Sequence, residues 1–279
     1  MTLLVPLAGP SSSAVAAPSP NPATCGVRGP AHYQHVVWIV LENVGYSVVN
    51  SPSAPYLNSL ARACGLATNY DSVTHPSLPN YIALTSGSPQ GITDDNDPAS
   101  HHLSVPSIFS QLGSNWTSLV ESMPTSCDQV SSGQYAAKHN PAAYYVNLGS
   151  ACRRQDVALK YPLNLQRAFT LIVPNVCNDM HSCPVATGDA WLRRVVPMIT
   201  RSPLYRARSL ALFITFDENT SASSNQVPTY VVAPSVGRGQ RVSAPLNSYS
   251  LLLTTEQLLH RPALAGARGA RSMVALFHL

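Results

Sequence analysis

The stretch THPSLPNYIALTSG, from Thr74 to Gly87, places His75, Ser77 and Asn80 around the start of an apolar segment. Ser77 lies where that segment would begin as a helix, with Pro79 in its first turn. A helix N-terminus carries unpaired backbone N–H groups and the positive end of the helix dipole, so it binds phosphate readily. A hydroxyl there either caps the helix or, once activated by a base or a metal, attacks a bound phosphorus or acyl centre.

Oxygen ligands for such a metal follow two apolar runs. Glu42-Asn43 come directly after HVVWIVL, and Asp217-Glu218 end the run SLALFITFDE. Carboxylate and amide oxygens suit hard divalent cations, and a bound cation lowers the pKa of a coordinated oxygen nucleophile. Glu42-Asn43 also fit a plain strand-end turn, and Asp217-Glu218 also fit the start of a solvated loop. However, acids at the ends of buried strands cost free energy unless they are solvated, paired or metal-bound.

Two loops offer imidazole groups to the same chemistry. His139-Asn140 stand in YAAKHNPAAYY, and Asp179 and His181 stand in PNVCNDMHSC, between two cysteines whose disulfide would hold that loop rigid. A surface or helix-capping role fits His139 and His181 equally well on this evidence. His101-His102 lie in a Ser- and Asp-rich loop, and we interpret them as ordinary surface residues.

The elements that would position these residues alternate between strands and helices. Continuous apolar runs predict buried strands, and longer apolar segments with capping residues predict helices. The predicted strands are 35–41, 116–122, 169–175, 209–218 and 227–236, and the predicted helices are 54–63, 78–87, 104–113, 188–200 and 249–259. This order indicates an α/β fold with a mostly parallel central sheet and helices on both faces. Glu42-Asn43, Asn175 and Asp217-Glu218 would then meet at the carboxyl edge of the sheet, where such folds bind ligands.

Length and composition narrow the class of protein. The 279 residues suffice for one large core or at most two small ones. Charged residues make up 11% of the chain, which is low against roughly 25% in a typical domain. The net charge of +4 is spread without a basic run, which argues against nucleic-acid binding and only weakly favours anionic substrates. No apolar run reaches the ~20 residues of a membrane-spanning helix.

The N-terminal segment and the cysteines predict an exported protein. Residues 1–30 combine a short apolar start with a small-residue region in which Ala14-Val15-Ala16 fits a signal-peptide cleavage pattern. The positive n-region is missing, so a disordered Pro/Ser tail is the alternative. Six cysteines suggest disulfides, with free buried thiols as the alternative. They allow 15 pairings, of which short loops favour Cys177–Cys183 and Cys127–Cys152, leaving Cys25–Cys64.

Taken in order, six segments resemble the bacterial phosphoesterase family of acid phosphatases and phospholipase C-type enzymes: HVVWIVLEN, THPSLPNYIALTSG, YAAKHNP, PNVCNDMHSC, LFITFDE and YSLLLTTEQLL. Within that family, GDAWLRR, SSNQVPT and TTEQLL are most similar to mycobacterial-type secreted acid phosphatases that act on phosphoinositides. The resemblance spans roughly residues 33 to 276. It implies an alkaline-phosphatase-like fold for a phosphoesterase domain at 31–279. It also implies hydrolysis of phosphomonoesters, with phosphoinositides as candidate substrates.

The resemblance further implies roles for individual residues. Ser77 would be the nucleophile. The groups that contact phosphate oxygens or protonate the leaving group would be Asn80, His139 and His181. The ligands of one divalent metal ion, whose identity is open, would be Glu42, Asn43, Asp217 and Glu218. His75 and Asp179 would orient these groups, and the whole site would stabilise negative charge on the transferring phosphoryl group.

Two features depart from the family pattern. Ser248-Tyr249 stand where family members usually carry His-Tyr, and the segment NTSASSNQ lacks the usual Gly-Gly. A lost ligand would lower the activity, shift its pH optimum or abolish it. The alternatives to a secreted acid phosphatase are therefore a phospholipase C-type phosphodiesterase and a non-catalytic binder of phosphate or a lipid headgroup. A sulfatase is disfavoured because no C-x-P-x-R or S-x-P-x-R sequence is present, and the oligomeric state stays open.

Overall fold

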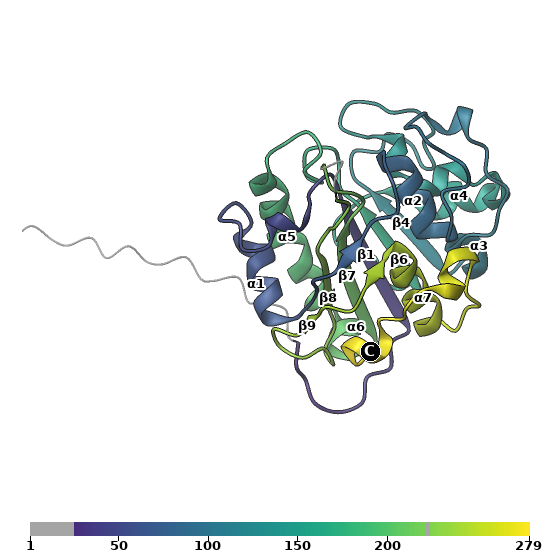
Figure 1. The fold of residues 1–279 in the computed structure, drawn as a ribbon. Helices are drawn as coiled ribbons and strands as arrows, with labels where there is room; N and C mark the ends of the chain where they lie inside the picture. The colour runs from purple at the N-terminus through teal and green to yellow at the C-terminus, as the bar shows by residue number, and fades with distance from the viewer. Residues whose placement is uncertain (1–24, 221–223) are drawn as a thin grey trace, which may run out of the picture.

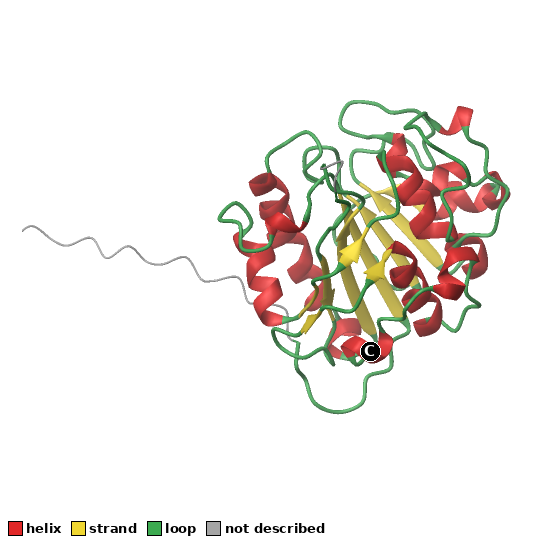
Figure 2. Cartoon of the chain, in the orientation of Figure 1, coloured by secondary structure: helices red, strands yellow, loops and turns green. Residues whose placement is uncertain are grey.

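The computed structural model describes residues 25–220 and 224–279, which form a central eight-stranded sheet with helices around it (Figure 1, Figure 2). The strands are β1 His35–Leu41, β2 Gly65–Ala67, β3 Tyr70–Asp71, β4 Trp116–Val120, β5 Asp156–Ala158, β6 Phe169–Val173, β7 Leu210–Phe216, β8 Thr229–Val232, β9 Arg241–Val242 and β10 Leu246–Asn247. The α-helices are α1 Pro55–Ala63, α2 Ser77–Ser86, α3 Ile108–Leu112, α4 Ser150–Gln155, α5 Val185–Thr200, α6 Pro203–Arg206, α7 Ser248–Leu258 and α8 Val274–Phe277.

β1 lies near the centre of the sheet, between β6 and β7, and both run parallel to it. The full order is β5-β4-β6-β1-β7-β8-β2-β9, in which β8 is antiparallel to both of its neighbours. β1 and β7 are buried nearly throughout, because helices cover both faces of the sheet at its centre. The predicted mostly parallel sheet is therefore confirmed.

Helices cover the sheet from two sides. In Figure 1, α1 and α5 lie together on one side, and α2 packs with α7 on the other. α2 is buried along its whole length and also contacts the 3-10 helix η3, Ala137–His139. A helix enclosed in this way can be apolar all round, which is why its sequence shows little amphipathic pattern. The predicted layers of helix, sheet and helix are present.

Two predicted elements differ from the structure. The predicted helix 104–113 is shortened to α3, because Pro106 disfavours the helical conformation in the residue before it and Ser107 caps the helix. The predicted strand 227–236 is shortened to β8. β8 runs antiparallel to β7, which the sequence does not predict because an apolar run carries no information about the direction of its strand. The other predicted elements are present, with ends shifted by a few residues.

Three disulfides join Cys25 to Cys64, Cys127 to Cys152 and Cys177 to Cys183. These are the pairs that short loops favour, so the alternative of free thiols is wrong. The first bond ties the segment before β1 to the end of α1, and the third closes a small loop after β6.

The predicted signal peptide, including Ala14-Val15-Ala16, falls mainly in residues 1–24, which lie outside the described residues. The described residues share one hydrophobic core that reaches from Cys25 to Phe277. A domain boundary near residue 31 stays a prediction. Among the described helices, none is long and apolar enough to cross a membrane.

Candidate active site

Glu42 and Asp217 lie side by side at the carboxyl edge of the sheet. β1 and β7 pair in parallel with Leu41 opposite Phe216, so the next residue of each strand falls at the same level. The Asp217 N–H donates to the Leu41 carbonyl at 2.9 Å, and both acidic side chains are fully buried. The structure thus brings these two strand ends together, as the sequence predicted.

Ser77 opens α2 beside this pair of acids. Its Oγ donates to Glu42 Oε2 at 2.9 Å, and one turn further along the helix the Tyr81 hydroxyl donates to Glu42 Oε1 at 2.7 Å. The N-cap position belongs to Pro76, and the Ser77 side chain makes no capping hydrogen bond. The capping interpretation of Ser77 is therefore wrong. Its hydroxyl is buried against carboxylates instead.

The acids of this edge are buried close to one another. Burial, and then the charges of Asp217 and Asp179, raise the pKa of Glu42 well above its usual value. Burial and the charge of Glu218 raise the pKa of Asp217, while hydrogen bonds from the backbone N–H groups of Asn43 and Glu218 oppose the rise. Asp217 Oδ2 is buried without a hydrogen-bond partner. Buried like charges and an unpartnered carboxylate oxygen fit a bound cation.

Asn43 and Glu218 form the turn around Asp217. Their backbone N–H groups donate to Asp217 Oδ1 at 3.1 and 2.7 Å. Asn43 has a φ of +54°, a left-handed conformation that asparagine tolerates better than most residues, and its Nδ2 lies 3.5 Å from Glu42 Oε2. Burial and then the charge of Asp95 raise the pKa of Glu218 to about 7. The backbone of Asn43 and Glu218 therefore wraps around the Asp217 carboxylate, which places the four predicted metal ligands in one turn region. That all four bind one ion stays a prediction.

His139 approaches the other oxygen of Glu42. Its Nε2 lies 3.3 Å from Glu42 Oε1 without hydrogen-bond alignment, and its Nδ1 lies 3.1 Å from Asp179 Oδ2. The ring stacks on Tyr81 with centroids 5.5 Å apart. Burial and then the charge of Lys138 lower the pKa of His139 to about 3, so this imidazole is neutral at neutral pH.

The Cys177–Cys183 loop brings Asp179 and His181 to the same place. Asp179 Oδ1 accepts from the His181 N–H at 2.7 Å, and the Asp179 carbonyl accepts from the Glu42 N–H at 2.8 Å. The rings of His181 and His139 lie 5.5 Å apart. Ligand atoms of Glu42, His139 and His181 lie within 4.8 Å of one another, so they form a second possible metal-binding set that shares Glu42 with the predicted one.

His75 and Asn80 both contact Glu218. His75 Nδ1 lies 2.7 Å from Glu218 Oε2, and Asn80 Nδ2 lies 3.4 Å from the same oxygen. The Asn80 side chain accepts two N–H groups and donates to two carbonyls, all from the backbone of residues 73–76. Asn80 therefore shapes the loop that enters α2, and its amide hydrogens are already engaged.

Lys138 and Asp95 form an ion pair next to these residues. Lys138 Nζ lies 2.7 Å from Asp95 Oδ2 and 3.4 Å from His181 Nε2. The other oxygen of Asp95 accepts from the Leu78 N–H at 3.0 Å, in the first turn of α2. This pair thus links the helix that carries the candidate nucleophile to the candidate phosphate-binding histidines.

Sequence reasoning missed Tyr81, Lys138 and Asp95. Tyr81 could have been found because it follows Ser77 by one helical turn on the same face of α2. Lys138 directly precedes His139 in the chain. Asp95 carried no such signal, because the loop after α2 that returns it to the start of the helix has no regular pattern.

Asn175 and Ser248 serve other parts of the structure. Asn175 Oδ1 accepts from the N–H groups of Cys177 and Asn178, so it shapes the disulfide loop and does not join the acids. Ser248 is buried at the start of α7 near the Tyr70 hydroxyl. A second cluster that could suit a metal by distance includes Cys127 and Cys152, whose sulfurs are joined in a disulfide.

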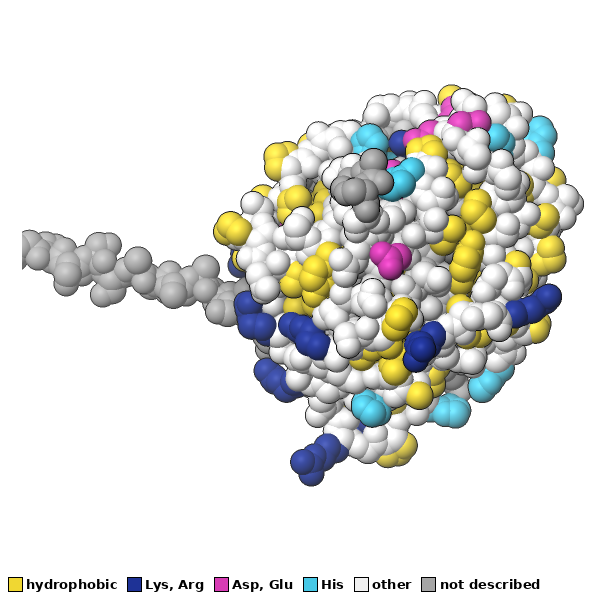
Figure 3. All heavy atoms as spheres, in the orientation of Figure 1, with side chains coloured by type: hydrophobic (Ala, Val, Ile, Leu, Met, Phe, Trp, Pro, Cys, Tyr) yellow, Lys and Arg dark blue, Asp and Glu magenta, His cyan; other side chains and the backbone are white. Residues whose placement is uncertain are grey.

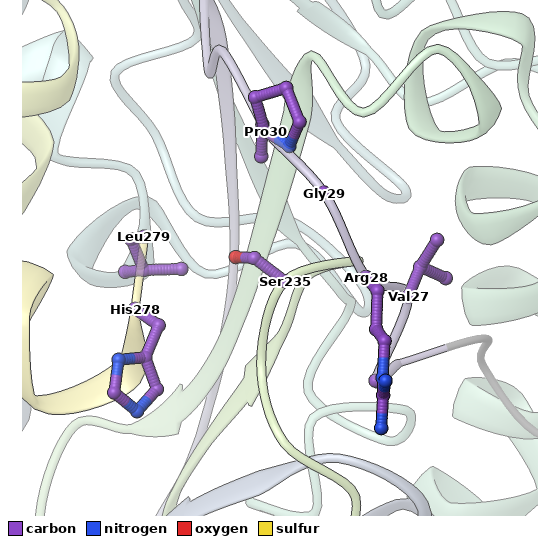
Figure 4. Close-up of a pocket in the computed structure, with 9 residues that line it drawn as sticks. Val27, Arg28, Gly29, Pro30, Ser235, His278 and Leu279 are labelled. Carbon is purple, nitrogen blue, oxygen red and sulfur yellow. The ribbon is translucent and has the colours of Figure 1, made fainter.

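The two ends of the molecule differ at the surface. Figure 3 shows acidic and histidine side chains gathered with a basic one at the end where α2 begins, and most other basic side chains of this face toward the opposite end. A cavity of about 430 Å³ lies at that opposite, amino edge of the sheet (Figure 4). The segment 26–31, Ser235 and residues 278–279 line it, so it is separate from the candidate active site.

Solved structures share this fold at low sequence identity. A protein of the alkaline phosphatase superfamily from Vibrio parahaemolyticus is 12% identical, with a TM-score of 0.58 over 86% of this chain and 69% of that one. A sulfatase-like protein from Bacteroides thetaiotaomicron is 10% identical, with a TM-score of 0.60 over 88% of this chain and 74% of that one. These likenesses define the fold alone. The fold is alkaline-phosphatase-like, as predicted.

The sequence relatives narrow this class. The model of the Phosphoesterase family matches residues 46–260. Phosphatidylinositol-3-phosphatase of Mycobacterium tuberculosis is 31% identical, over 85% of this chain and 81% of that protein. The phosphate-repressible acid phosphatase of Penicillium chrysogenum is 28% identical, over 78% of this chain and 56% of that protein. This chain belongs to the Phosphoesterase family, and it is a hydrolase that acts on phosphoric ester bonds.

The family match and the sequence relatives cover most of the chain, but they assign no role to a single residue. The matched span includes Ser77 and Asp217-Glu218 but begins after Glu42-Asn43. The chain spans just over half the length of the Penicillium relative and 51% of a similar acid phosphatase from Aspergillus fumigatus. The family and the enzyme class are confirmed, and the roles of the individual residues stay predictions.

Proposed function

We propose that the chain hydrolyses phosphomonoesters through a phosphoserine intermediate on Ser77. The observation that supports this most directly is the hydrogen bond of 2.9 Å from Ser77 Oγ to Glu42 Oε2 at the start of α2. A serine that merely caps a helix turns its oxygen toward backbone N–H groups. This serine instead faces carboxylates that can accept its proton or hold a cation, as an activated nucleophile requires.

The reaction would proceed in two balanced steps. First, Ser77 Oγ bonds to phosphorus while the ester P–O bond breaks, the serine proton passes to Glu42, and the leaving alcohol oxygen takes up a proton. Second, water attacks the phosphoserine, the P–Oγ bond breaks, and Ser77 regains a proton as inorganic phosphate leaves. We assign the proton for the leaving group to His181, because its side chain is exposed whereas that of His139 is buried; burial and then the charge of Lys138 lower the pKa of both imidazoles.

The remaining predicted residues would bind and orient. His139, fixed between Asp179 and Tyr81, would contact a phosphoryl oxygen through its unpartnered Nε2. Asn80, with its amide engaged by the loop backbone, would mainly hold Ser77 in position, and a direct phosphate contact is its second proposed role.

A divalent cation held by Glu42, Asn43, Asp217 and Glu218 fits the unpartnered Asp217 Oδ2 and the buried like charges around it. When bound, it would supply the positive charge that stabilises an ionised serine oxygen and the phosphoryl oxygens. Glu42, His139 and His181 are the competing ligand set. Loss of metal binding in Asp217→Asn, but not in His181→Gln, would favour the first set.

The substrate and location are also proposals. The Mycobacterium tuberculosis relative is named for phosphatidylinositol 3-phosphate, so phosphoinositides are candidate substrates of this chain. Three disulfides support export, because such bonds persist in oxidising compartments.

The first experiment compares wild type, Ser77→Ala and Ser107→Ala for phosphate release from a chromogenic phosphomonoester, with and without EDTA. We expect Ser77→Ala and EDTA each to remove at least about 10³-fold of the rate, on the order of the loss of a nucleophile or its activating metal. Ser107 is a buried serine that caps α3. Ser107→Ala should cost ~1 kcal/mol of stability and leave the rate almost unchanged.

Other results would redirect the proposal. If acid-quenched turnover placed the phosphate on another residue, the role of Ser77 would be wrong. Cleavage of phosphatidylcholine with no release from monoesters would identify a phospholipase C-type phosphodiesterase. Binding of phosphoinositide with no release under any metal or pH would identify a non-catalytic binder.

A further inference from the structure

Lys138 brings a positive charge into a site that is otherwise rich in acids. Burial raises the pKa of Glu42, of Asp179 and of Glu218, and in each case the charge of Lys138 acts in the opposite direction. Lys138 belongs to the short helix η3, next to His139, and η3 packs on α2. Its place relative to Ser77 is therefore set by the same contacts that place His139.

Asp95 occupies a position between two hydrogen-bond donors. One carboxylate oxygen accepts from the Leu78 N–H at 3.0 Å, and the other from Lys138 Nζ at 2.7 Å. Leu78 directly follows Ser77, so its N–H is among the unpaired donors of the α2 N-terminus. An ammonium group and a helix N–H beside a nucleophile are the donors that a tetrahedral oxyanion would use.

We propose that Lys138 binds a phosphoryl oxygen of the substrate, and that Asp95 is the internal anion that holds Lys138 and the Leu78 N–H until substrate arrives. This inference rests on the proposed function. Binding would exchange one anion for another. The Lys138 ammonium and the Leu78 N–H would move from the Asp95 carboxylate to the phosphate.

The exposure of the ion pair permits this exchange. The side chains of Lys138 and Asp95 are 19% and 31% exposed, so an incoming anion can reach both. Because both side chains are mostly buried, releasing Asp95 costs more than it would in a fully exposed ion pair, and the contacts of Lys138 and the Leu78 N–H with phosphate would have to offset that cost. A phosphate dianion would otherwise meet the charges of Glu42, Asp217 and Glu218 with less compensation. His139, which follows Lys138 in the chain, has a buried Nε2 without a hydrogen-bond partner, and this provides an independent indication of a ligand in the site.

The test uses inorganic phosphate as the probe and the metal-loaded protein, or the protein as purified if no metal supports turnover. Binding is measured by calorimetry, and KM and kcat with a chromogenic monoester, for wild type, Lys138→Met, Lys138→Arg and Asp95→Asn. Lys160→Met is the matched control, because it removes the same charge from an exposed loop after β5. Melting temperatures show which variants fold.

The expected results have opposite signs for the two partners. Lys138→Met should weaken phosphate binding about ten- to a hundredfold, as the loss of a charge-assisted hydrogen bond does, with partial recovery in Lys138→Arg. Asp95→Asn should tighten phosphate binding, because the amide keeps an acceptor for the Leu78 N–H but holds Lys138 less strongly. Lys160→Met should match wild type.

A purely structural ion pair would behave differently. It would make Lys138→Met and Asp95→Asn alike in phosphate affinity and in melting temperature, and this result would overturn the inference. Unchanged phosphate affinity and KM in an active Lys138→Met protein would overturn it as well while leaving the proposed function intact. Conversely, a wild type that binds phosphate through Lys138 but releases none would support the inference and refute the proposed function.

Discussion

The two edges of the sheet differ in how their charged side chains are paired. At the amino edge, the Arg208 guanidinium donates to the backbone carbonyls of Val27, Arg28 and Gly29. At the carboxyl edge, Glu42 and Asp217 are buried side by side, and Asp217 Oδ2 has no partner. A charge met by backbone carbonyls stabilises the fold. Buried, uncompensated acids cost stability, so they indicate a place where a ligand is expected.

The largest expected effect on turnover is that of Asp217→Asn. We expect the rate to fall at least about 10³-fold, because the change weakens the cation site beside Ser77. In EDTA at pH 7, the free energy of unfolding of the same variant should be higher than that of wild type. Burial and the charge of Glu218 raise the pKa of Asp217 to about 8, and an amide removes the cost of this raised pKa. Phosphate release and chemical denaturation in EDTA measure the two effects.

Arg208→Met is the control at the amino edge. We expect it to lower the free energy of unfolding by about 1 kcal/mol, the net worth of exposed hydrogen bonds whose carbonyls water can pair again, with the rate changed less than twofold. If Asp217→Asn destabilised the metal-free protein as Arg208→Met does, the contrast between the two edges would be lost.

The disulfides at the two edges should separate stability from activity. The Cys25–Cys64 and Cys177–Cys183 bonds close separations of 39 and 6 residues. Chain entropy predicts losses of about 4 and about 2 kcal/mol when each pair is replaced by serines. The rate should respond in the reverse order, falling about tenfold or more only for Cys177→Ser/Cys183→Ser, because that loop carries Asp179 and His181.

Thermal unfolding and kinetics of the two double variants give this comparison directly. The Cys127→Ser/Cys152→Ser variant serves as an intermediate case, because the disulfide that it removes closes a separation of 25 residues. Equal loss of rate on removing the Cys25–Cys64 and the Cys177–Cys183 disulfides would contradict a specific positioning role for the loop after β6.

The smallest expected effect on turnover is that of Asp156→Asn. Asp156 is fully buried, and burial raises the pKa of its carboxyl to about 7 against the hydrogen bond from Asn140. The unfolded value is about 3.9, so between about pH 4 and 7 the folded protein binds the extra proton. The free energy of unfolding therefore carries no penalty from Asp156 below about pH 4, and it falls as the pH rises from about 4 through 7.

Asp156→Asn should therefore gain stability relative to wild type at pH 8 but not at pH 4, with the rate changed less than threefold. Urea denaturation at several pH values in EDTA tests this. A large loss of activity would show that buried carboxylates away from Ser77 also serve the reaction, which would weaken the distinction drawn from the edges of the sheet.

Sequence reasoning reached the strand ends more easily than the loops. Glu42-Asn43 and Asp217-Glu218 were predictable because each pair ends a buried apolar run, and parallel neighbours end at one edge of a sheet. Asn175 also ends such a run, yet its side chain turns to the disulfide loop. The pattern specifies where a strand ends, but local hydrogen bonds decide where the last side chain points.

The sequence by itself determined the layered α/β fold, the favoured disulfide pairs and the polar residues around Ser77, because apolar runs, loop lengths and helix starts are local features. Only the tertiary structure decided that Ser77 faces Glu42 instead of capping α2, and that Asp95 returns to bridge Leu78 and Lys138. These contacts join residues separated by 17 to 43 positions along the chain. The packing of loops against α2 creates them, and no local pattern encodes that packing.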